Sequence, residues 1–314
     1  MHNAPLYEDI LEGPKNGNSE WVQTKDNFRL RVAFWTKENA LGTVIIFPGR
    51  NEYIEKYGRT CKKFWELGYS SLVVDWRGQG LSDRYFKNRL IGHVNSFIDY
   101  QIDVEAITKF LVSKKLPKPW HLLAHSMGGA IGLRALHNGF AVKKVIFSAP
   151  MWEIRMHLNY FKDNLMHVYG RNSYLAYKML KLENNYVPGV DQIPYLETAE
   201  FENNSLTTDR DYFQFLKNQI LLYPELALAG PSVKWLNTAL LECQKLKKLT
   251  PPTIPCLTFS SPTDRIVSND AIKKLLRNWN NSKHLEIGNT EHEILMEDPE
   301  LLQLIYSVIR NFLT

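Results

Sequence analysis

The chain alternates short apolar runs with longer amphipathic segments, and this alternation predicts its secondary structure. Continuous apolar runs bounded by Gly, Pro, Ser or Asp are typical of strands buried on both faces of a parallel sheet. Such runs occupy residues 43–47, 71–74, 121–124, 145–147, 256–259 and 285–287. Residues 28–35 differ, because apolar residues there alternate with Arg29 and Arg31, and this pattern predicts a half-exposed strand.

Helical periodicity fills most of the intervals between these runs. Apolar residues recur at helical spacing in residues 57–66, 98–113, 130–137, 271–279 and 301–312. Alternation of strands and helices predicts an α/β sheet with helices on both faces. Ligands of open α/β sheets bind in the loops at the carboxyl ends of the strands, so we look for chemistry in those loops.

Residues 151–234 interrupt this rhythm. The stretch contains no convincing buried strand, is rich in Tyr, Phe, Leu, Met and Asn, and shows helical spacing at Tyr174, Tyr177, Lys178 and Lys181. We therefore predict a core built from residues 1–150 and 235–314, with residues 151–234 inserted as a helical cap. A spacer with only a structural role is the alternative.

Composition and charge exclude several classes of protein. The chain has 314 residues, of which 44% are hydrophobic and 23% charged, and this profile excludes a disordered or fibrous chain. The net charge of +5 is too small to indicate a nucleic-acid partner. Cys61, Cys243 and Cys256 lie far apart and form no C-x-x-C pair, so neither a metal site nor a disulfide framework is indicated. With no secretory signal and no apolar run of membrane-spanning length, we expect a cytoplasmic protein.

The segment from His121 to Ala130 carries the strongest chemical signal. It reads as a strand, a tight turn and a helix, which is the context of a nucleophile elbow. Residues two before and two after the nucleophile must be small, and these positions hold Ala124 and Gly128. Ser126 is therefore the candidate nucleophile, and the backbone N–H of Met127 is placed to stabilise negative charge. A structural Ser-Gly turn is the alternative.

A serine nucleophile needs a base and an acid that orients the base. In the order typical of α/β hydrolases, both follow later strands, the acid before the base. Asp264 follows the run at 256–259 and His292 follows the run at 285–287, so we predict Asp264 as the acid and His292 as the base. Asp270 and Glu291 compete with Asp264 for the acid role.

These motifs together resemble the α/β-hydrolase superfamily, and within it the serine hydrolase branch of monoacylglycerol lipases and bacterial lysophospholipases. Residues 47–53, Phe-Pro-Gly-Arg-Asn-Glu-Tyr, resemble the H-G-x-x-E segment of that branch, with Pro48 in place of histidine. Residues 75–82 match D-x-R-G-x-G-x-S. The resemblance implies a mostly parallel central sheet flanked by helices, an inserted helical cap, and an oxyanion hole formed by the backbone N–H groups of Arg50 and Met127.

The same resemblance implies hydrolysis of an ester through an acyl-enzyme, with no metal or organic cofactor. We interpret Glu52 as a structural partner of loop groups rather than a second acid, and Asp75 and Arg77 as residues that pin the loop after the run at 71–74. The charge of the Arg50 side chain is a candidate to hold an anionic headgroup.

The apolar and aromatic residues of the insert, with Met151, Trp152 and Phe161 foremost, are predicted to line a pocket for a fatty acyl chain of a lysophospholipid or a monoacylglycerol. The alternative is that these residues form the cap's own core. A small-ester carboxylesterase, a peptidase of the same fold and a non-catalytic ligand-binding homologue are the alternatives.

A small basic and apolar patch lies shortly after the insert, formed by Lys245, Leu246, Lys247, Lys248 and Leu249. It is a candidate for peripheral contact with the inner face of a membrane. The alternative is a solvated helix end. The sequence leaves the oligomeric state open.

Overall fold

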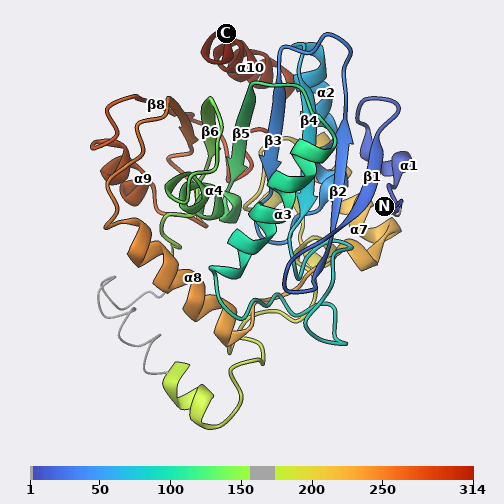
Figure 1. Ribbon diagram of the computed structural model, residues 1–314. Coiled ribbons are helices and arrows are strands. Elements are labelled where there is room, and N and C mark those ends of the chain that lie inside the picture. Colours follow the sequence, from blue (N-terminus) through green and yellow to red (C-terminus); the bar gives the residue numbers. More distant parts are fainter. Residues whose placement is uncertain (1–2, 156–173) are drawn as a thin grey trace.

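The computed structural model describes residues 3–155 and 174–314 and shows a central sheet with helices on both faces (Figure 1). The strands are β1 (Asn18–Gln23), β2 (Arg29–Trp35), β3 (Thr43–Phe47), β4 (Ser70–Asp75), β5 (Trp120–His125), β6 (Lys144–Ser148), β7 (Cys256–Ser260) and β8 (Ser282–Glu286). Their order in the sheet is β1-β2-β4-β3-β5-β6-β7-β8. Strands β3 to β8 are parallel, and β2 pairs antiparallel with both β1 and β4. The predicted α/β architecture with a mostly parallel sheet is confirmed.

The strands at the centre of the sheet are apolar because they are covered on both faces. Every residue of β3, β4, β5 and β7 is buried, which agrees with their continuous apolar runs. Two differences from the prediction occur towards the edges. Strand β1 was not predicted, and β8 begins at Ser282 rather than at residue 285.

The half-exposed character predicted for residues 28–35 is wrong. Arg29 is exposed, but every later residue of β2 is buried, including Arg31. The Arg31 guanidinium is neutralised inside the protein, since its Nε donates to Asp75 at 2.7 Å and its terminal nitrogens donate to Glu55 at 2.8 and 2.7 Å. A fully paired arginine can occupy an inward position of a strand that its charge alone would place outside.

The helices cover the sheet in two groups. They are α1 (Glu8–Leu11), α2 (Gly58–Glu66), α3 (Asp99–Ser113), α4 (Met127–His137), α6 (Tyr195–Thr198), α7 (Arg210–Leu222), α8 (Val233–Leu246), α9 (Asn269–Leu276) and α10 (Pro299–Leu313), with short 3-10 helices η1 (Ile54–Tyr57), η2 (Phe201–Asn203) and η3 (Pro224–Leu226). Helix α4 contacts both α3 and α8 on one face of the sheet, while α2 and α10 lie behind it (Figure 1). On that second face, Phe64 of α2 packs edge-on against Tyr306 of α10.

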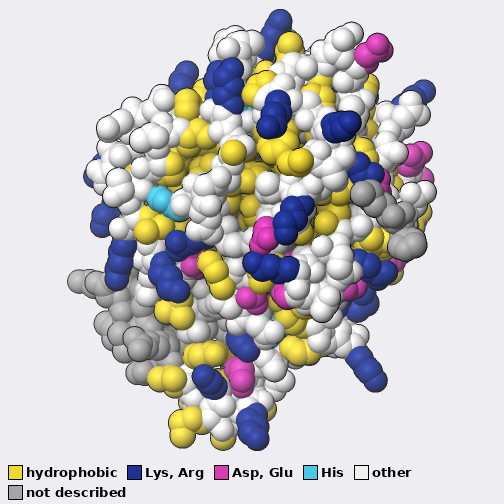
Figure 2. Space-filling view, viewed as in Figure 1, with side chains coloured by type: hydrophobic (Ala, Val, Ile, Leu, Met, Phe, Trp, Pro, Cys, Tyr) yellow, Lys and Arg dark blue, Asp and Glu magenta, His cyan; other side chains and the backbone are white. Residues whose placement is uncertain are grey.

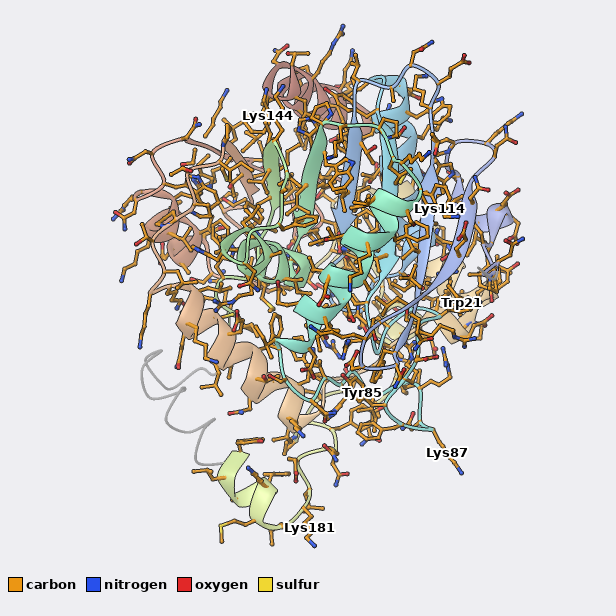
Figure 3. All side chains as sticks on the ribbon, viewed as in Figure 1. Trp21, Tyr85, Lys87, Lys114, Lys144 and Lys181 are labelled. Atoms are coloured by element: carbon orange, nitrogen blue, oxygen red, sulfur yellow. The ribbon has the colours of Figure 1, made fainter. Side chains whose placement is uncertain are left out.

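The described part of the segment between β6 and β7 contributes helices and no strand to the sheet. Lys144, the first residue of β6, lies at one end of the sheet, and Lys181 lies beyond the opposite end (Figure 3). The segment therefore extends past the carboxyl ends of the parallel strands. Helix α7 is anchored to the core, because Gln219 donates to the carbonyls of Ile10 and Glu55 and accepts a 3.0 Å hydrogen bond from Tyr53. The division of the chain at residues 151 and 234 stays a prediction.

Figure 2 shows lysine and arginine side chains scattered over one face of the molecule among hydrophobic and acidic groups. Among the residues that the structure describes, no helix combines the length and hydropathy needed to cross a membrane.

Candidate active site

Ser126 occupies a strained turn between β5 and α4. Its φ of 49° and ψ of −119° place a residue with a side chain in a sparsely populated region, which costs about 1–3 kcal/mol. The tight turn is possible because glycines at positions 128 and 129, in the first turn of α4, have no side chains that would clash with neighbouring segments. A Cβ at Gly128 would overlap the carbonyl oxygen of Phe47, and a Cβ at Gly129 would lie 2.5 Å from Pro150. Gly128 therefore allows the start of α4 to approach the end of β3.

The structure brings Ser126, His292 and Asp264 together in one line of hydrogen bonds. His292 Nε2 lies 2.8 Å from Ser126 Oγ, and His292 Nδ1 lies 2.7 Å from Asp264 Oδ2. All three side chains are buried. Asp264 follows β7 and His292 follows β8, so the carboxyl ends of the strands place them beside the elbow.

Asp264 is held as a carboxylate. Burial opposes its ionisation, but the charge and hydrogen bond of His292 outweigh this cost and lower the pKa of Asp264. The backbone N–H groups of Ile266 and Val267 also donate to Asp264 Oδ1, at 2.7 and 3.0 Å. A fixed carboxylate on Nδ1 leaves Nε2 facing the serine as the proton acceptor.

The loop after β3 lies against the elbow and carries Arg50. A Cβ at Gly49 would lie 3.0 Å from the Ser126 Cβ, so the backbone of this loop passes next to the serine. Met127 is the first residue of α4, where backbone N–H groups are not used within the helix. These are the two predicted oxyanion-hole donors, and their role stays a prediction.

Glu52 fixes the conformation of this loop. Its Oε2 accepts hydrogen bonds from the backbone N–H of Gly49 and from the Tyr57 hydroxyl, the latter at 2.6 Å. Its Oε1 accepts from Lys56 Nζ at 2.6 Å. The geometry agrees with the loop-holding role that the sequence assigned to Glu52.

Lys56 joins the loop to the histidine segment through Glu293, the residue after His292. Lys56 Nζ also donates to Glu293 Oε1 at 2.6 Å, and all of these side chains are buried. Burial opposes the charge on Glu293, but Lys56 and His125 outweigh it and hold the pKa of Glu293 well below its usual range. The buried cluster therefore contains two carboxylates and the Lys56 ammonium.

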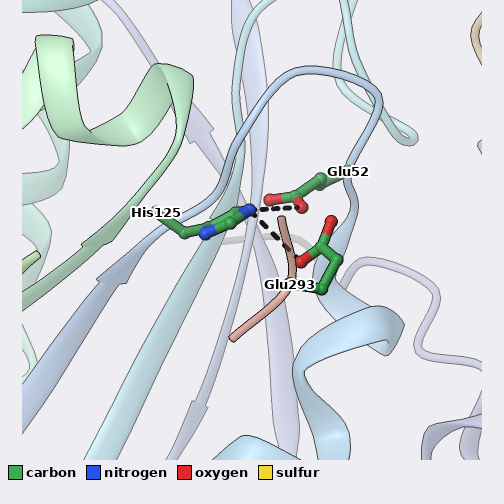
Figure 4. Close-up of side chains that lie close together, drawn as sticks. All are labelled: Glu52, His125 and Glu293. Carbon is green, nitrogen blue, oxygen red and sulfur yellow. Dashed lines mark ion pairs between the residues drawn. The ribbon is translucent and has the colours of Figure 1, made fainter. Parts of the chain in front are cut away.

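His125 completes this buried cluster (Figure 4). Its Nδ1 lies 3.0 Å from the carbonyl oxygen of Ser148, and its Nε2 lies 3.2 Å from Glu293 Oε2 and 3.5 Å from Glu52 Oε1. Both ring nitrogens thus face acceptors, and an imidazolium carries the N–H groups that match both, although Nε2 makes no hydrogen bond within the described part of the chain. Burial lowers the pKa of His125, but Glu293 and Glu52 outweigh burial and raise it.

With His125 protonated, Glu52, Glu293, Lys56 and His125 form a cluster without net charge; we call these four residues the charge cluster. The donor atoms of Glu52, His125 and Glu293 lie within 4.8 Å of one another, a spacing that a metal ion could use. Lys56 already bridges both carboxylates and supplies the positive charge that a metal would bring. Sequence reasoning missed this cluster, although His125 and Glu293 are direct neighbours of the predicted nucleophile and base.

A cavity of about 360 Å³ opens onto Ser126 and His292. Its apolar wall comes mainly from the segment between β6 and β7, which includes α8, through residues Met151, Ile154, Pro194, Leu196, Leu206, Ile220, Ala227, Leu228, Pro231, Trp235 and Leu236. Arg50 and Tyr53 line it from the side of the β3 loop. The cavity has the size and apolar lining of a small-molecule site.

Of the three predicted pocket residues, Met151 lines this cavity. Trp152 does not, because its ring is buried against Phe147 and its Nε1 donates to the carbonyl of Gly129 at 3.3 Å. Its aromatic surface fills the core beneath α4 instead of the cavity. Phe161 lies outside the described residues.

The predicted basic and apolar patch at residues 245–249 does not present an apolar face. Leu246 is buried, Leu249 packs against the core, and Lys247 pairs with Glu153. Strongly exposed apolar side chains occur instead at Met179 and Leu180, which directly precede Lys181 in the chain.

Comparison with known proteins places the chain in a family. The model of the Hydrolase_4 family, described as serine aminopeptidase, S33, matches residues 38–299. A probable lysophospholipase L2 from Haemophilus influenzae is 27% identical over 276 residues, covering 86% of this chain and 83% of that protein. Lysophospholipase L2 from Escherichia coli K12 is 26% identical over 309 residues, covering 91% and 84%.

A solved structure shows the same fold. A soluble variant of monoglyceride lipase from Saccharomyces cerevisiae superposes with a TM-score of 0.70 at 19% identity, covering 94% of each chain. With the family match spanning most of the sequence, the chain belongs to the Hydrolase_4 (serine aminopeptidase, S33) family and is an α/β hydrolase.

Proposed function

We propose that this protein is a serine hydrolase of carboxylic esters, with Ser126 as nucleophile, His292 as base and Asp264 as the orienting acid. The observation that carries the proposal is the unbroken line of hydrogen bonds from Asp264 through His292 to Ser126, at 2.7 and 2.8 Å. The lysophospholipase names of the two bacterial relatives support ester hydrolysis.

In the proposed mechanism, His292 Nε2 accepts the Ser126 proton as Oγ attacks the carbonyl carbon of the ester. Asp264 stabilises the imidazolium that forms, and His292 returns the proton to the leaving alcohol. The backbone N–H groups of Arg50 and Met127 bind the oxyanion, and one such donor contributes about 3 kcal/mol in comparable enzymes. Water then hydrolyses the acyl-enzyme with His292 again as base.

We further propose a fatty acyl ester as the substrate, in a lysophospholipid or a monoacylglycerol. The apolar wall of the cavity suits an acyl chain placed with its carbonyl at Ser126. Met151, next to the elbow, and Trp235 of α8 are part of that wall.

The family description raises a second candidate, an aminopeptidase. Such an enzyme needs a free carboxylate to hold the substrate ammonium. The carboxylates that line the cavity in the described part of the chain, Glu52 and Glu293, are already bonded to Lys56 and face His125. This arrangement favours the esterase, and an aminoacyl anilide assayed beside the esters tests it.

Ser126→Ala tests the proposed nucleophile. It should abolish hydrolysis of 1-oleoylglycerol and oleoyl lysophosphatidylcholine while the far-UV circular dichroism spectrum and melting temperature stay close to wild type. Asp264→Asn should lower kcat by about 10⁴-fold, because the imidazole loses its tautomer control. Ester hydrolysis that persists in Ser126→Ala would rule out this nucleophile.

A further inference from the structure

The side chain of Arg50 is held at the wall of the cavity by contacts that leave its charge uncompensated. One terminal nitrogen donates to the carbonyl oxygen of Ala229, and the guanidinium lies 5.2 Å from the ring centre of Trp235. Its Nε is buried and has no hydrogen-bond partner. A carbonyl and an aromatic face orient a guanidinium, but neither neutralises it.

No carboxylate pairs with Arg50 among residues 3–155 and 174–314. The charged side chains that line the cavity there are Arg50, Glu52, Lys56 and Glu293. Lys56 is bonded to both carboxylates, and Arg50 has no ion-pair partner in that part of the chain. Burial without an acid nearby lowers the pKa of Arg50 to about 10, so the side chain is still charged at neutral pH.

A buried charge without a partner is unfavourable unless a ligand supplies the partner. Arginine suits phosphate because its planar N–H groups match two phosphate oxygens at once. We propose that the Arg50 side chain recognises the phosphate of an acylglycerol headgroup, and so selects phosphorylated over unphosphorylated acylglycerols. This proposal rests on the proposed ester hydrolase function.

In such a substrate, the ester and the phosphate are close enough in the covalent structure for Arg50 to contact both. The backbone N–H of Arg50 is the proposed donor to the ester oxyanion. Its side chain extends from the same Cα by a chain comparable in length with the glycerol spacer between the ester and the phosphate. The acyl chain then lies along the apolar wall, and the phosphate meets the only unpaired charge that the described residues bring to the cavity.

The test compares two substrates that differ only in the phosphate, 1-hexanoylglycerol 3-phosphate and 1-hexanoylglycerol, each below its aggregation concentration. The measured quantity is the ratio of their kcat/KM values. Arg50→Gln should lower this ratio about 10- to 100-fold, the range expected for losing hydrogen bonds to a charged group. A change in the oxyanion hole affects both esters alike and cancels in the ratio.

Two further variants sharpen the test. Arg210→Gln removes the same charge from an exposed side chain paired with Glu202, and it should leave the ratio unchanged. Arg50→Lys keeps the charge, so it should lower the ratio of kcat/KM values less than Arg50→Gln does. An equal ratio in wild type and Arg50→Gln, or a wild type that hydrolyses only the unphosphorylated ester, overturns the headgroup assignment and leaves the esterase intact. If wild type hydrolyses neither ester, the proposed function itself fails.

Discussion

Replacing Lys56 with methionine should destabilise the protein strongly, although methionine has a similar length and greater hydrophobicity. Lys56 Nζ lies 2.6 Å from Glu52 Oε1 and 2.6 Å from Glu293 Oε1, and all three side chains are buried. Burial lowers the pKa of Lys56, but the two carboxylates outweigh burial and raise it, so the ammonium is charged in the folded protein. Without it, the two buried carboxylates keep only the His125 ring as a neighbour that can carry positive charge.

Removing one partner of a buried ion pair costs about 3–5 kcal/mol, because the remaining charge is left uncompensated. Lys56 serves two carboxylates, so we expect a loss in this range. The free energy of unfolding of an ordinary protein is about 5–15 kcal/mol, so Lys56→Met should remove a large share of it. Urea unfolding followed by tryptophan fluorescence measures the loss as a shift of the midpoint at unchanged slope.

The double variant Lys56→Met/Glu293→Gln identifies the cause. It removes one negative charge together with the positive one, so the charge cluster becomes neutral again. We expect the double variant to be more stable than the sum of the single effects predicts, by about 1–3 kcal/mol. Lys109→Met, which removes an exposed lysine paired with Glu105, is the matched control and should cause no measurable loss. Strict additivity, or a Lys56→Met midpoint equal to wild type, would refute the reasoning.

Two other predictions concern the elbow and the pH dependence of stability. Gly128→Ala should lower kcat about 100-fold, because the added Cβ overlaps the Phe47 carbonyl and separates the β3 loop from Ser126. Steady-state kinetics measures this loss, with circular dichroism as the control for folding. A variant with the kcat of wild type would contradict the prediction. Folding raises the pKa of His125, so protonation of His125 stabilises the folded protein. This stabilisation is fully present below about pH 6.5, the pKa of histidine in an unfolded chain, and it is lost as pH rises through the pKa of His125 in the folded protein. Unfolding free energies of wild type and His125→Gln should therefore converge as pH rises above about 6.5, and a constant difference would show that folding does not raise the pKa of His125.

The sequence predicted the parts of the site that depend on local order along the chain. Ser126 is recognisable because a strand, small neighbours and a helix must surround a nucleophile elbow. Asp264 and His292 are recognisable because parallel strands deliver their following loops to one edge of the sheet. Both rules need only the neighbouring residues and the sheet topology, and the structure places the three side chains within hydrogen-bonding distance.

The parts that escaped prediction depend on contacts between distant segments. Arg31 was expected at the surface because its partners, Glu55 and Asp75, belong to other elements. Trp152 was expected in the pocket, but which aromatic residues face a cavity and which fill the core depends on tertiary packing. The helical stretches around Leu196 and Trp235 form part of the cavity wall. The spacing of their apolar residues does not show which of them face the cavity and which face the hydrophobic core.

The charge cluster connects stability to substrate choice. Glu52 holds the β3 loop, His125 precedes the nucleophile and Glu293 follows the base, so a single buried cluster fixes three segments relative to one another. Because its carboxylates are satisfied internally, they offer little attraction to a cationic substrate. Electrostatic selection in the described cavity therefore falls on Arg50, whose charge has no such partner. Because Lys56 pairs with both Glu52 and Glu293 inside the protein, the cavity favours an anionic ligand without a further positive residue in its wall.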